Sequence, residues 1–142
     1  MNRFKNWKNP IFDEDGWAYE DSGWKSCPIR KKYGWRCLHS DNLKLGKNID
    51  IGNFTHMNAK YIIEIGDNVQ MGPHCSIISE DTESGINGKI SIGDNTVIGA
   101  YTLILPNSNI PANIKVRARS IIRGSGDKTI LFDVIDNEWR EI

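Results

Sequence analysis

The sequence contains little cysteine, no long hydrophobic run and no excess of charge of one sign. Its 142 residues include three cysteines. An odd, small number of cysteines argues against a disulfide framework and fits a reducing cytosol. Cys27 and Cys37 are conceivable zinc ligands, but without a second pair they are a weak signal. Unmodified thiols are the simpler interpretation, and no metal site is expected.

Membrane insertion and nucleic-acid binding are also disfavoured. Lys+Arg and Asp+Glu both number 18, so no net charge draws the chain to nucleic acid or to an anionic membrane. The longest apolar runs, such as Leu103-Ile104-Leu105, are far shorter than a membrane span. The N-terminus lacks the apolar segment of a secretory signal. We therefore expect a cytoplasmic protein of one domain.

A six-residue period dominates the middle of the chain. Aliphatic residues open successive units of six in three blocks: Leu45, Ile51 and Met57; Ile65, Met71 and Ile77; Ile92, Ile98, Ile104, Ile110, Val116 and Ile122. A second small or β-branched residue follows within most units: Ile49, Thr55, Val69, Cys75, Thr96, Thr102, Ser108, Ile114 and Ser120. Internal repeats of this kind indicate a repeat architecture.

The period predicts an all-β fold, a parallel β-helix. Six residues match neither a helical repeat nor a continuous strand, but they fit a short strand followed by a corner. Three units then make one triangular turn, and stacked turns bury a continuous apolar column. A β-sandwich is the alternative, but its strands would recur at a wider spacing. We expect positive φ at the corner glycines and asparagines: Gly46, Gly52, Gly66, Gly72, Gly93, Gly99, Asn48, Asn53, Asn68, Asn95, Asn107 and Asn113.

The interruptions between blocks predict which unit lies on which. Two extra residues near Ile62 place the Met71 unit on the Ile51 unit. If the next interruption adds three residues, the Ile92 unit lies on the Met71 unit.

This register also predicts the surroundings of two histidines. His74 is expected on an outward corner, above Phe54 and below Asn95, and His56 is expected beneath Ser76.

The flanking segments lack the repeat and divide the chain into three parts. Residues 1–42 are expected to cap the open lower end of the β-helix formed by residues 43–123, whose loop 79–89 leaves the coil. The basic stretch 24–37 suits a solvated cap face, and the alternatives are a phosphate-bearing ligand or RNA. Residues 124–142 are expected to form a terminal strand or a short helix on the last coil. The cap contains four tryptophans: Trp7, Trp17, Trp24 and Trp35.

The repeat resembles a known family of enzymes. The segments IGDNVQMGPHCSII and IGDNTVIGAYTLILPNSNIPANI resemble those of the hexapeptide-repeat acyltransferases, over about residues 43–123. The resemblance is strongest to the small sugar acetyltransferases. It implies a left-handed parallel β-helix, a homotrimer, and acetyl-CoA as acyl donor. It also implies a sugar or nucleotide-sugar acceptor that presents a hydroxyl or an amine.

In this family a histidine acts as general base on the acceptor. His74, in Gly72-Pro73-His74-Cys75, matches the family's histidine position and is the predicted catalytic residue. His56 is the second candidate, as base or as a polar neighbour. An imidazole suits this role because its ordinary pKa lies near neutrality. His39 precedes the repeat and is expected to be structural or exposed.

The resemblance also implies contacts to the two substrates. The basic residues Lys115, Arg117 and Arg119 are candidates for the phosphates of CoA, since charge-assisted pairs suit them. Ala100 and Ala118 are candidate backbone contacts to the same cofactor, and Ala100-Tyr101 stands where relatives often have Ser-His. The candidate acceptor-binding residues are Glu80, Asp81 and Tyr101.

Two other functions fit the same architecture. A catalytically silent trimeric binding or structural module would explain why the loop 79–89 has no histidine. A metalloenzyme of the γ-carbonic anhydrase type needs three histidines around zinc, two of them close in sequence. His39, His56 and His74 contain no such close pair.

Overall fold

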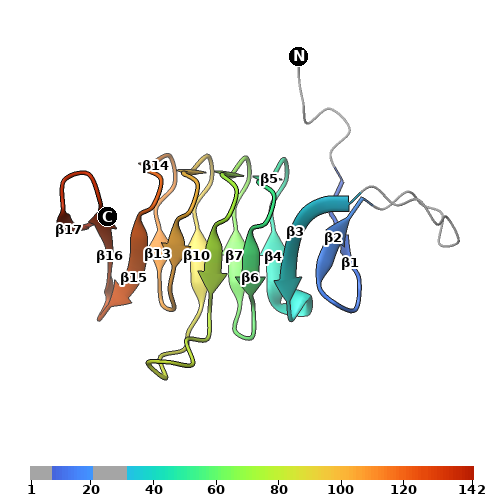
Figure 1. The fold of residues 1–142 in the computed structure, drawn as a ribbon, viewed down its shortest axis with the longest axis horizontal. Coiled ribbons are helices and arrows are strands. Elements are labelled where there is room, and N and C mark those ends of the chain that lie inside the picture. The colour runs from blue at the N-terminus through green and yellow to red at the C-terminus, as the bar shows by residue number, and fades with distance from the viewer. Residues whose placement is uncertain (1–7, 21–31) are drawn as a thin grey trace, which may run out of the picture.

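The computed structural model describes residues 8–20 and 32–142 of the chain (Figure 1). Trp7, Trp24, Cys27 and the part of the basic stretch before residue 32 lie outside the described residues. Strands and corners alternate throughout the described part, with one short 3-10 turn, η1 (Ser40–Asn42). The fold is therefore all-β, as the period predicts.

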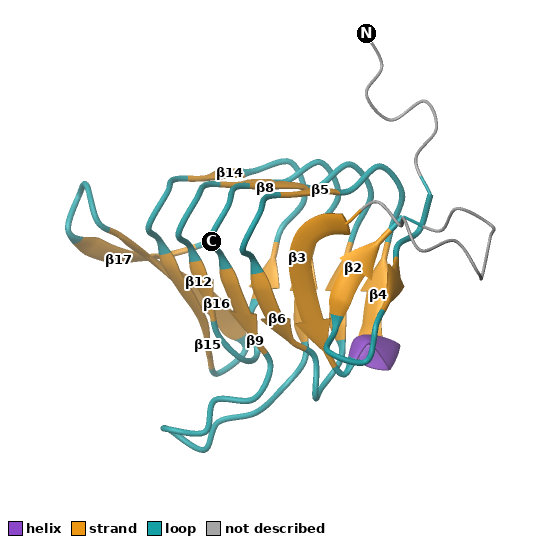
Figure 2. Ribbon diagram, turned by 45° about the vertical axis from the view of Figure 1, so that its right-hand side comes forward, coloured by secondary structure: helices purple, strands orange, loops and turns teal. Residues whose placement is uncertain are grey.

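The strands stack into three sheets that form the sides of a parallel β-solenoid (Figure 2). The first sheet contains β4 (Leu43–Leu45), β7 (Ile63–Ile65), β10 (Ile90–Ile92) and β13 (Asn109–Ile110). The second contains β5 (Asp50–Ile51), β8 (Gln70–Met71), β11 (Val97–Ile98) and β14 (Lys115–Val116). Each sheet holds one strand from every turn, so three hexads make one turn.

The third sheet has nine strands and runs the length of the molecule. Its parallel part is β3 (Lys32–Leu38), β6 (His56–Asn58), β9 (Ser76–Ile78), β12 (Leu103–Ile104) and β15 (Ile121–Ser125). Antiparallel strands extend both ends: β1 (Ile11–Phe12) and β2 (Trp17–Tyr19) at one, β16 (Lys128–Asp133) and β17 (Glu138–Glu141) at the other. The C-terminal extension thus forms strands, not a helix.

The core is the predicted apolar column. The residues that open the units are buried, except Leu45, which is only partly buried. Met57, Ile77, Ile104 and Ile122 have no exposed surface. Most of the second inward residues are buried as well, whereas Ile114 is only partly buried. Alternate residues of each strand point inward and outward. The period of six therefore corresponds to one strand and one corner per unit.

The predicted register is right for the lower turns and wrong above the loop. Ile51 pairs with Met71 as expected. Ile92 pairs with Ile65, however, and Ile98 takes the expected place of Ile92 on Met71. The loop holds more extra residues than the predicted three, so each later unit lies one side of the triangle earlier than predicted.

Asparagine, and not glycine, has the left-handed backbone expected at the corners of the repeat. Asn48, Asn68, Asn95, Asn107 and Asn113 have positive φ as predicted, but Asn53 does not, because Phe54 takes that conformation in its unit.

The corner glycines of the repeat are absent from the positive-φ positions among the described residues. They are small because the next turn lies against them: a Cβ on Gly72 would lie 2.6 Å from the Ala100 nitrogen. Close backbone approach, rather than left-handed backbone, is the reason for glycine here.

One corner carries an asparagine ladder between the first and second sheets. Asn48 donates to Asn68, Asn68 to Asn95 and Asn95 to Asn113, each over 3.1 Å. All four residues have φ between 58° and 62°. Asparagine tolerates this conformation, and its amide bonds to the turns on either side. This corner therefore has a purely structural explanation.

We expect Asn95→Ala to destabilise the solenoid more than Asn95→Gly. Both variants lose the two amide hydrogen bonds, but only alanine opposes the left-handed backbone, at a cost of about 1 kcal/mol. Urea denaturation followed by circular dichroism measures the difference in the free energy of unfolding. Equal stability of the two variants would contradict the role given to the backbone conformation.

Candidate functional site

His74 lies in a stack of side chains on the corner between the second and third sheets. Its ring stacks on Phe54 with centroids 5.0 Å apart and on Tyr101 with centroids 4.8 Å apart. The Arg119 guanidinium lies 5.4 Å from the centroid of the Tyr101 ring. We call these four residues the ring ladder. His74 thus lies above Phe54 as predicted, but below Tyr101 and not below Asn95.

The ring ladder is a strained arrangement that its own contacts stabilise. All four residues have φ between 59° and 65°, which bulky side chains rarely adopt and which costs about 1 kcal/mol or more per residue. Aromatic pairs contribute about 0.5–1.5 kcal/mol each, and the cation–π contact adds a similar amount. Stacking therefore offsets much of the strain and fixes the plane of the His74 ring. Its two faces are covered by Phe54 and Tyr101, so its edge is the part that can react.

His56 lies beside the ladder, on the outward face of the third sheet. It is half-buried and pairs with Arg36 on one side and Ser76 on the other, as predicted for Ser76. Burial lowers the pKa of His56, and the charge of Arg36 lowers it further. The imidazole is therefore held neutral near pH 7, which is the form that accepts a proton.

The hydrogen-bond acceptor of one backbone N–H per turn differs between the asparagine corner and the ladder corner. At the asparagine corner, the Lys47 N–H donates to Asp67 Oδ1 over 2.8 Å, and the Asp67 N–H donates to Asp94 Oδ1 over 2.7 Å. At the ladder corner, a proline and an alanine stand where these two aspartates stand. Within the described ranges, the N–H groups of Ala100 and Ala118 have no protein acceptor. They are therefore donors available to a ligand beside the ladder.

The three cationic residues predicted to bind the CoA phosphates have different surroundings. Arg119 belongs to the ladder, and Lys115 is exposed on β14. Arg117 instead contacts two carboxylates of the C-terminal hairpin, Asp133 over 3.3 Å and Asp136 over 3.6 Å. These partners could not be predicted from the sequence, because the hairpin that brings them to Arg117 is not part of the repeat.

Asp133 is the centre of this ion-pair group. It is buried, it accepts a second charged contact from Arg140 over 3.0 Å, and it accepts the N–H groups of Ile135 and Asp136. Burial alone would raise the pKa of this carboxyl, but the two N–H donors and the two arginines hold it below its usual value. Arg117 therefore serves the fold of the hairpin.

The predicted acceptor-binding residues lie apart from one another. Tyr101 is in the ladder, 53% exposed. Glu80 and Asp81 follow the other end of β9, where Glu80 contacts Lys60 over 3.5 Å and Asp81 accepts from Ser84 Oγ over 2.7 Å. These two acids thus stabilise the loop 79–89. A single chain does not bring them to His74.

The described residues offer no group of three or more metal-ligating side chains. His39 immediately precedes η1, away from the ladder corner, so the three histidines do not converge within one chain. Burial raises the pKa of Cys37 to about 12, which disfavours the thiolate that binds zinc.

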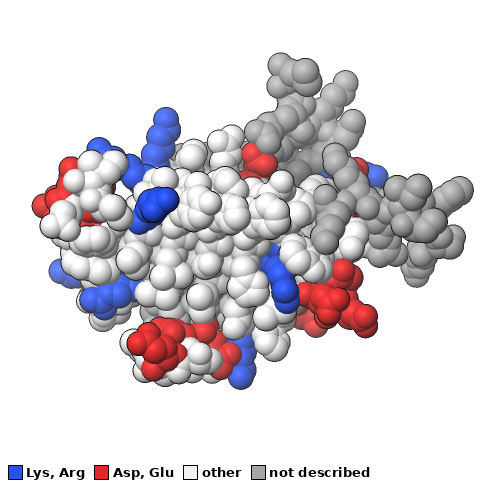
Figure 3. Space-filling view, viewed as in Figure 1, with Lys and Arg blue, Asp and Glu red and all other residues white. Residues whose placement is uncertain are grey.

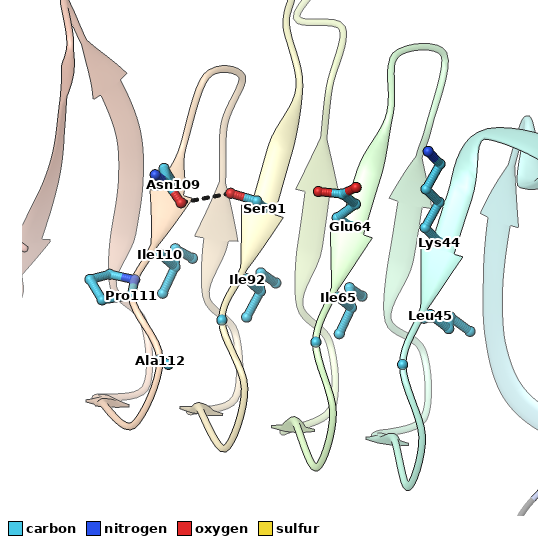
Figure 4. A pocket seen from close by; sticks show the side chains of 13 residues that line it. Lys44, Leu45, Glu64, Ile65, Ser91, Ile92, Asn109, Ile110, Pro111 and Ala112 are labelled. Atoms are coloured by element: carbon cyan, nitrogen blue, oxygen red, sulfur yellow. Dashed lines mark hydrogen bonds between the residues drawn. The ribbon is translucent and has the colours of Figure 1, made fainter.

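A shallow groove crosses the first sheet at the asparagine corner (Figure 4). Its volume is about 490 Å³, and it follows the line of Gly46, Gly66 and Gly93, where side chains are absent. Polar side chains along it satisfy one another, as Ser91 does with Asn109 over 2.7 Å. The groove borders neither His74 nor His56, and we assign it no ligand.

Comparisons with protein-family models, with curated proteins and with solved structures found no match. Within the described ranges, no helix combines the length and the apolar character needed to cross a bilayer. On the face seen in Figure 3, charged side chains lie mainly toward the rim and on the loop.

Two members of this site, Phe54 and Arg36, were not predicted as such from the sequence. Phe54 was assigned only as the neighbour below His74, and Arg36 only as part of a basic stretch. Arg36 lies before the repeat, so aligning the hexads does not identify it. Phe54 could have been found in this way, because it stands where Asn48 stands at the other corner. That substitution marks the ladder corner as different.

We expect His56 to make the stability of the protein depend on pH. Because its pKa in the folded state lies below the ordinary value of 6.5, the unfolded chain binds the proton more readily. The free energy of unfolding should therefore fall as the pH drops from about 7.5 to about 5.5. His56→Gln should show a weaker dependence in thermal denaturation across this range, and His39→Gln, at an exposed position, should not. An unchanged pH dependence in His56→Gln would contradict the assignment.

Proposed function

We propose that the chain is an acetyl-CoA-dependent acetyltransferase that acts on a hydroxyl or an amine of a sugar or nucleotide-linked sugar in the cytoplasm. The solenoid is the scaffold that the family resemblance implies. The observation that carries the proposal is the ring ladder, which presents the edge of His74 next to unpaired backbone donors. His74 is the proposed base, and His56 is its polar neighbour.

The reaction is a direct transfer. His74 takes the proton from the acceptor hydroxyl or amine, and the acceptor atom attacks the thioester carbonyl. The C–S bond then breaks, the acetyl group stays on the acceptor, and the proton passes to the departing CoA sulfur. An N–H donor near the developing oxyanion lowers the barrier, and Ala100 has such a donor without a protein acceptor among the described residues.

The acyl donor is proposed to bind at the upper end of the ladder. Arg119 and Lys115 carry positive charge there, and Ala100 and Ala118 leave the backbone accessible. CoA carries phosphates, and arginine binds phosphate through several donors. Arg117 stands in the same turn, but its contacts to Asp133 and Asp136 give it a structural role first.

The functional unit is proposed to be a homotrimer. Leu103 pairs with Ile121, Ile121 with Phe132, and Phe132 with Trp139, so four apolar side chains form one row on the outward face of the third sheet. An apolar row of this kind favours burial against another copy. Closure by a threefold axis would form three equivalent clefts, each containing a ladder corner. Light scattering should therefore give three times the protomer mass of 16.1 kDa.

A catalytically silent binding module is the second candidate. One observation favours it: within the described ranges, no carboxylate contacts either nitrogen of His74 to orient it. This candidate keeps the solenoid and the trimer but has no turnover.

We expect the wild-type protein to release CoA from acetyl-CoA in the presence of amino sugars or their nucleotide-linked forms. His74→Asn should lower turnover about 10²-fold or more, because general-base catalysis contributes this much. Asparagine suits the left-handed corner, so the variant should fold. Thiol release measures the rate, and a thermal shift with acetyl-CoA measures binding.

The variants His39→Gln and His56→Gln complete this test. His39→Gln should keep full activity. If His56→Gln lost turnover while His74→Asn kept it, the base would be His56. If the wild-type protein showed no turnover and no thermal shift with acetyl-CoA, the enzyme proposal would be overturned in favour of the silent module.

A further inference from the structure

The two corners provide an internal comparison of what the scaffold needs. Four successive turns use asparagine at the left-handed position of one corner, which suffices to build the solenoid. The corresponding positions of the other corner hold Phe54, His74, Tyr101 and Arg119. Architecture alone therefore does not require aromatic rings there. Residues with backbone strain and exposed apolar surface together indicate a binding surface.

The lower end of the ladder presents a ring face. His74 covers one face of Phe54, and the position below Phe54 in the same column is Gly34, whose carbonyl accepts the Phe54 N–H over 2.7 Å. Gly34 has φ of 88° and contributes no side chain to the ladder. Phe54 is accordingly 65% exposed. A planar ring could stack on it as the next member of the series.

A cation without a protein anion lies on the same turn as Gly34. Arg36 lies over the Trp17 ring, 5.4 Å from its centroid, and pairs with His56 in the third sheet. Its buried Nε has no hydrogen-bond partner, and among the described residues no carboxylate pairs with it. A bound anion, above all a phosphate, would stabilise a guanidinium in this state.

We infer that the lower end of the ladder binds a nucleoside diphosphate, with the base stacked on Phe54 and a phosphate on Arg36. A base alone would not use the cation, and a simple phosphate would not use the ring. Asn53, whose side chain lies against Gly34, can donate to the edge of the base. The inference rests on the proposed function and narrows it, because it makes the acceptor a nucleotide-linked sugar.

The geometry places the sugar of such an acceptor near the reactive edge. The His74 ring lies 5.0 Å from the Phe54 ring, on the face opposite the proposed base, and is therefore two levels above that base. The sugar beyond the diphosphate can therefore reach His74 or His56 along the third sheet. CoA also contains an adenine base and a diphosphate, but it is assigned to the Arg119 end of the ladder. The two ligands are thus separated by the ladder itself.

Binding of nucleoside diphosphates tests the inference without any turnover. Isothermal titration with UDP, dTDP, CDP, GDP and ADP should show binding of at least one, and more weakly of its free nucleoside. Phe54→Asn should weaken that binding at least fivefold, since the variant removes the aromatic ring on which the base stacks. Asparagine is the residue of the other corner, so this variant should keep the fold. Tyr61→Ala, at an exposed aromatic residue away from the ladder, should bind like wild type.

A second variant tests the phosphate contact. Arg36→Gln should reduce the affinity for the diphosphate toward that of the nucleoside and should leave the nucleoside affinity nearly unchanged. Unchanged diphosphate binding in both Phe54→Asn and Arg36→Gln would overturn the inference, as would the absence of binding for all five diphosphates. If only ADP bound, and desulfo-CoA competed with it, the site would belong to CoA and the acceptor assignment would be wrong.

The outcomes for the two proposals are distinguishable. Nucleotide binding that depends on Phe54, without any acetyl transfer, would support this site and overturn the enzyme proposal. Acetyl transfer to a free sugar, without nucleotide binding, would support the enzyme proposal and overturn the nucleotide site. Circular dichroism of each variant confirms that a loss of binding does not come from unfolding.

Discussion

The in-register hydrogen bonding of each turn to the turn below is the constraint on which the other features depend. Parallel strands lie about 4.8 Å apart, so side chains at equal positions of successive turns come into contact. The observed ring spacings of 5.0 Å and 4.8 Å in the ladder match this separation. Glycine is required where the spacing between turns leaves no room for a Cβ. Asparagines or aromatic rings form ladders where this spacing allows their side chains to hydrogen-bond or to stack. One spacing thus explains three different columns of residues.

The two ladders show how the same backbone can serve structure or leave a surface for function. The asparagine ladder combines a tolerated left-handed conformation with hydrogen bonds, so it stabilises the corner at little cost. The ring ladder pays a conformational cost at every turn and recovers it through stacking. Its exposed members, Phe54 and Tyr101, remain in contact with solvent. Repeating asparagine would give a stable corner at a lower conformational cost. The rings at the ladder corner therefore make it the candidate for function.

Much of the fold could be predicted from the sequence because the repeat is local. The period identifies the inward residues and places Met71 on Ile51. It does not reveal how many residues a polar loop contains beyond the coil, so Ile92 was placed one side too far along the turn. The pairing of Arg117 with Asp133 was also hidden, because their contact requires a hairpin that follows the last turn. The stacking of His74 between two rings depends on both the corner conformation and the correct register, and only the structure combines them.

The covered faces of His74 restrict the chemistry that the proposed site can perform. A ring enclosed between Phe54 and Tyr101 cannot rotate freely, so a proton can be taken only along its edge, in the plane perpendicular to the ladder. A ladder also has two ends of different character, an exposed phenyl face at Phe54 and a guanidinium at Arg119. The two ligands of the proposed reaction would approach from opposite ends and would not share a binding surface. A bisubstrate transfer benefits from this arrangement, because neither ligand must leave before the other binds.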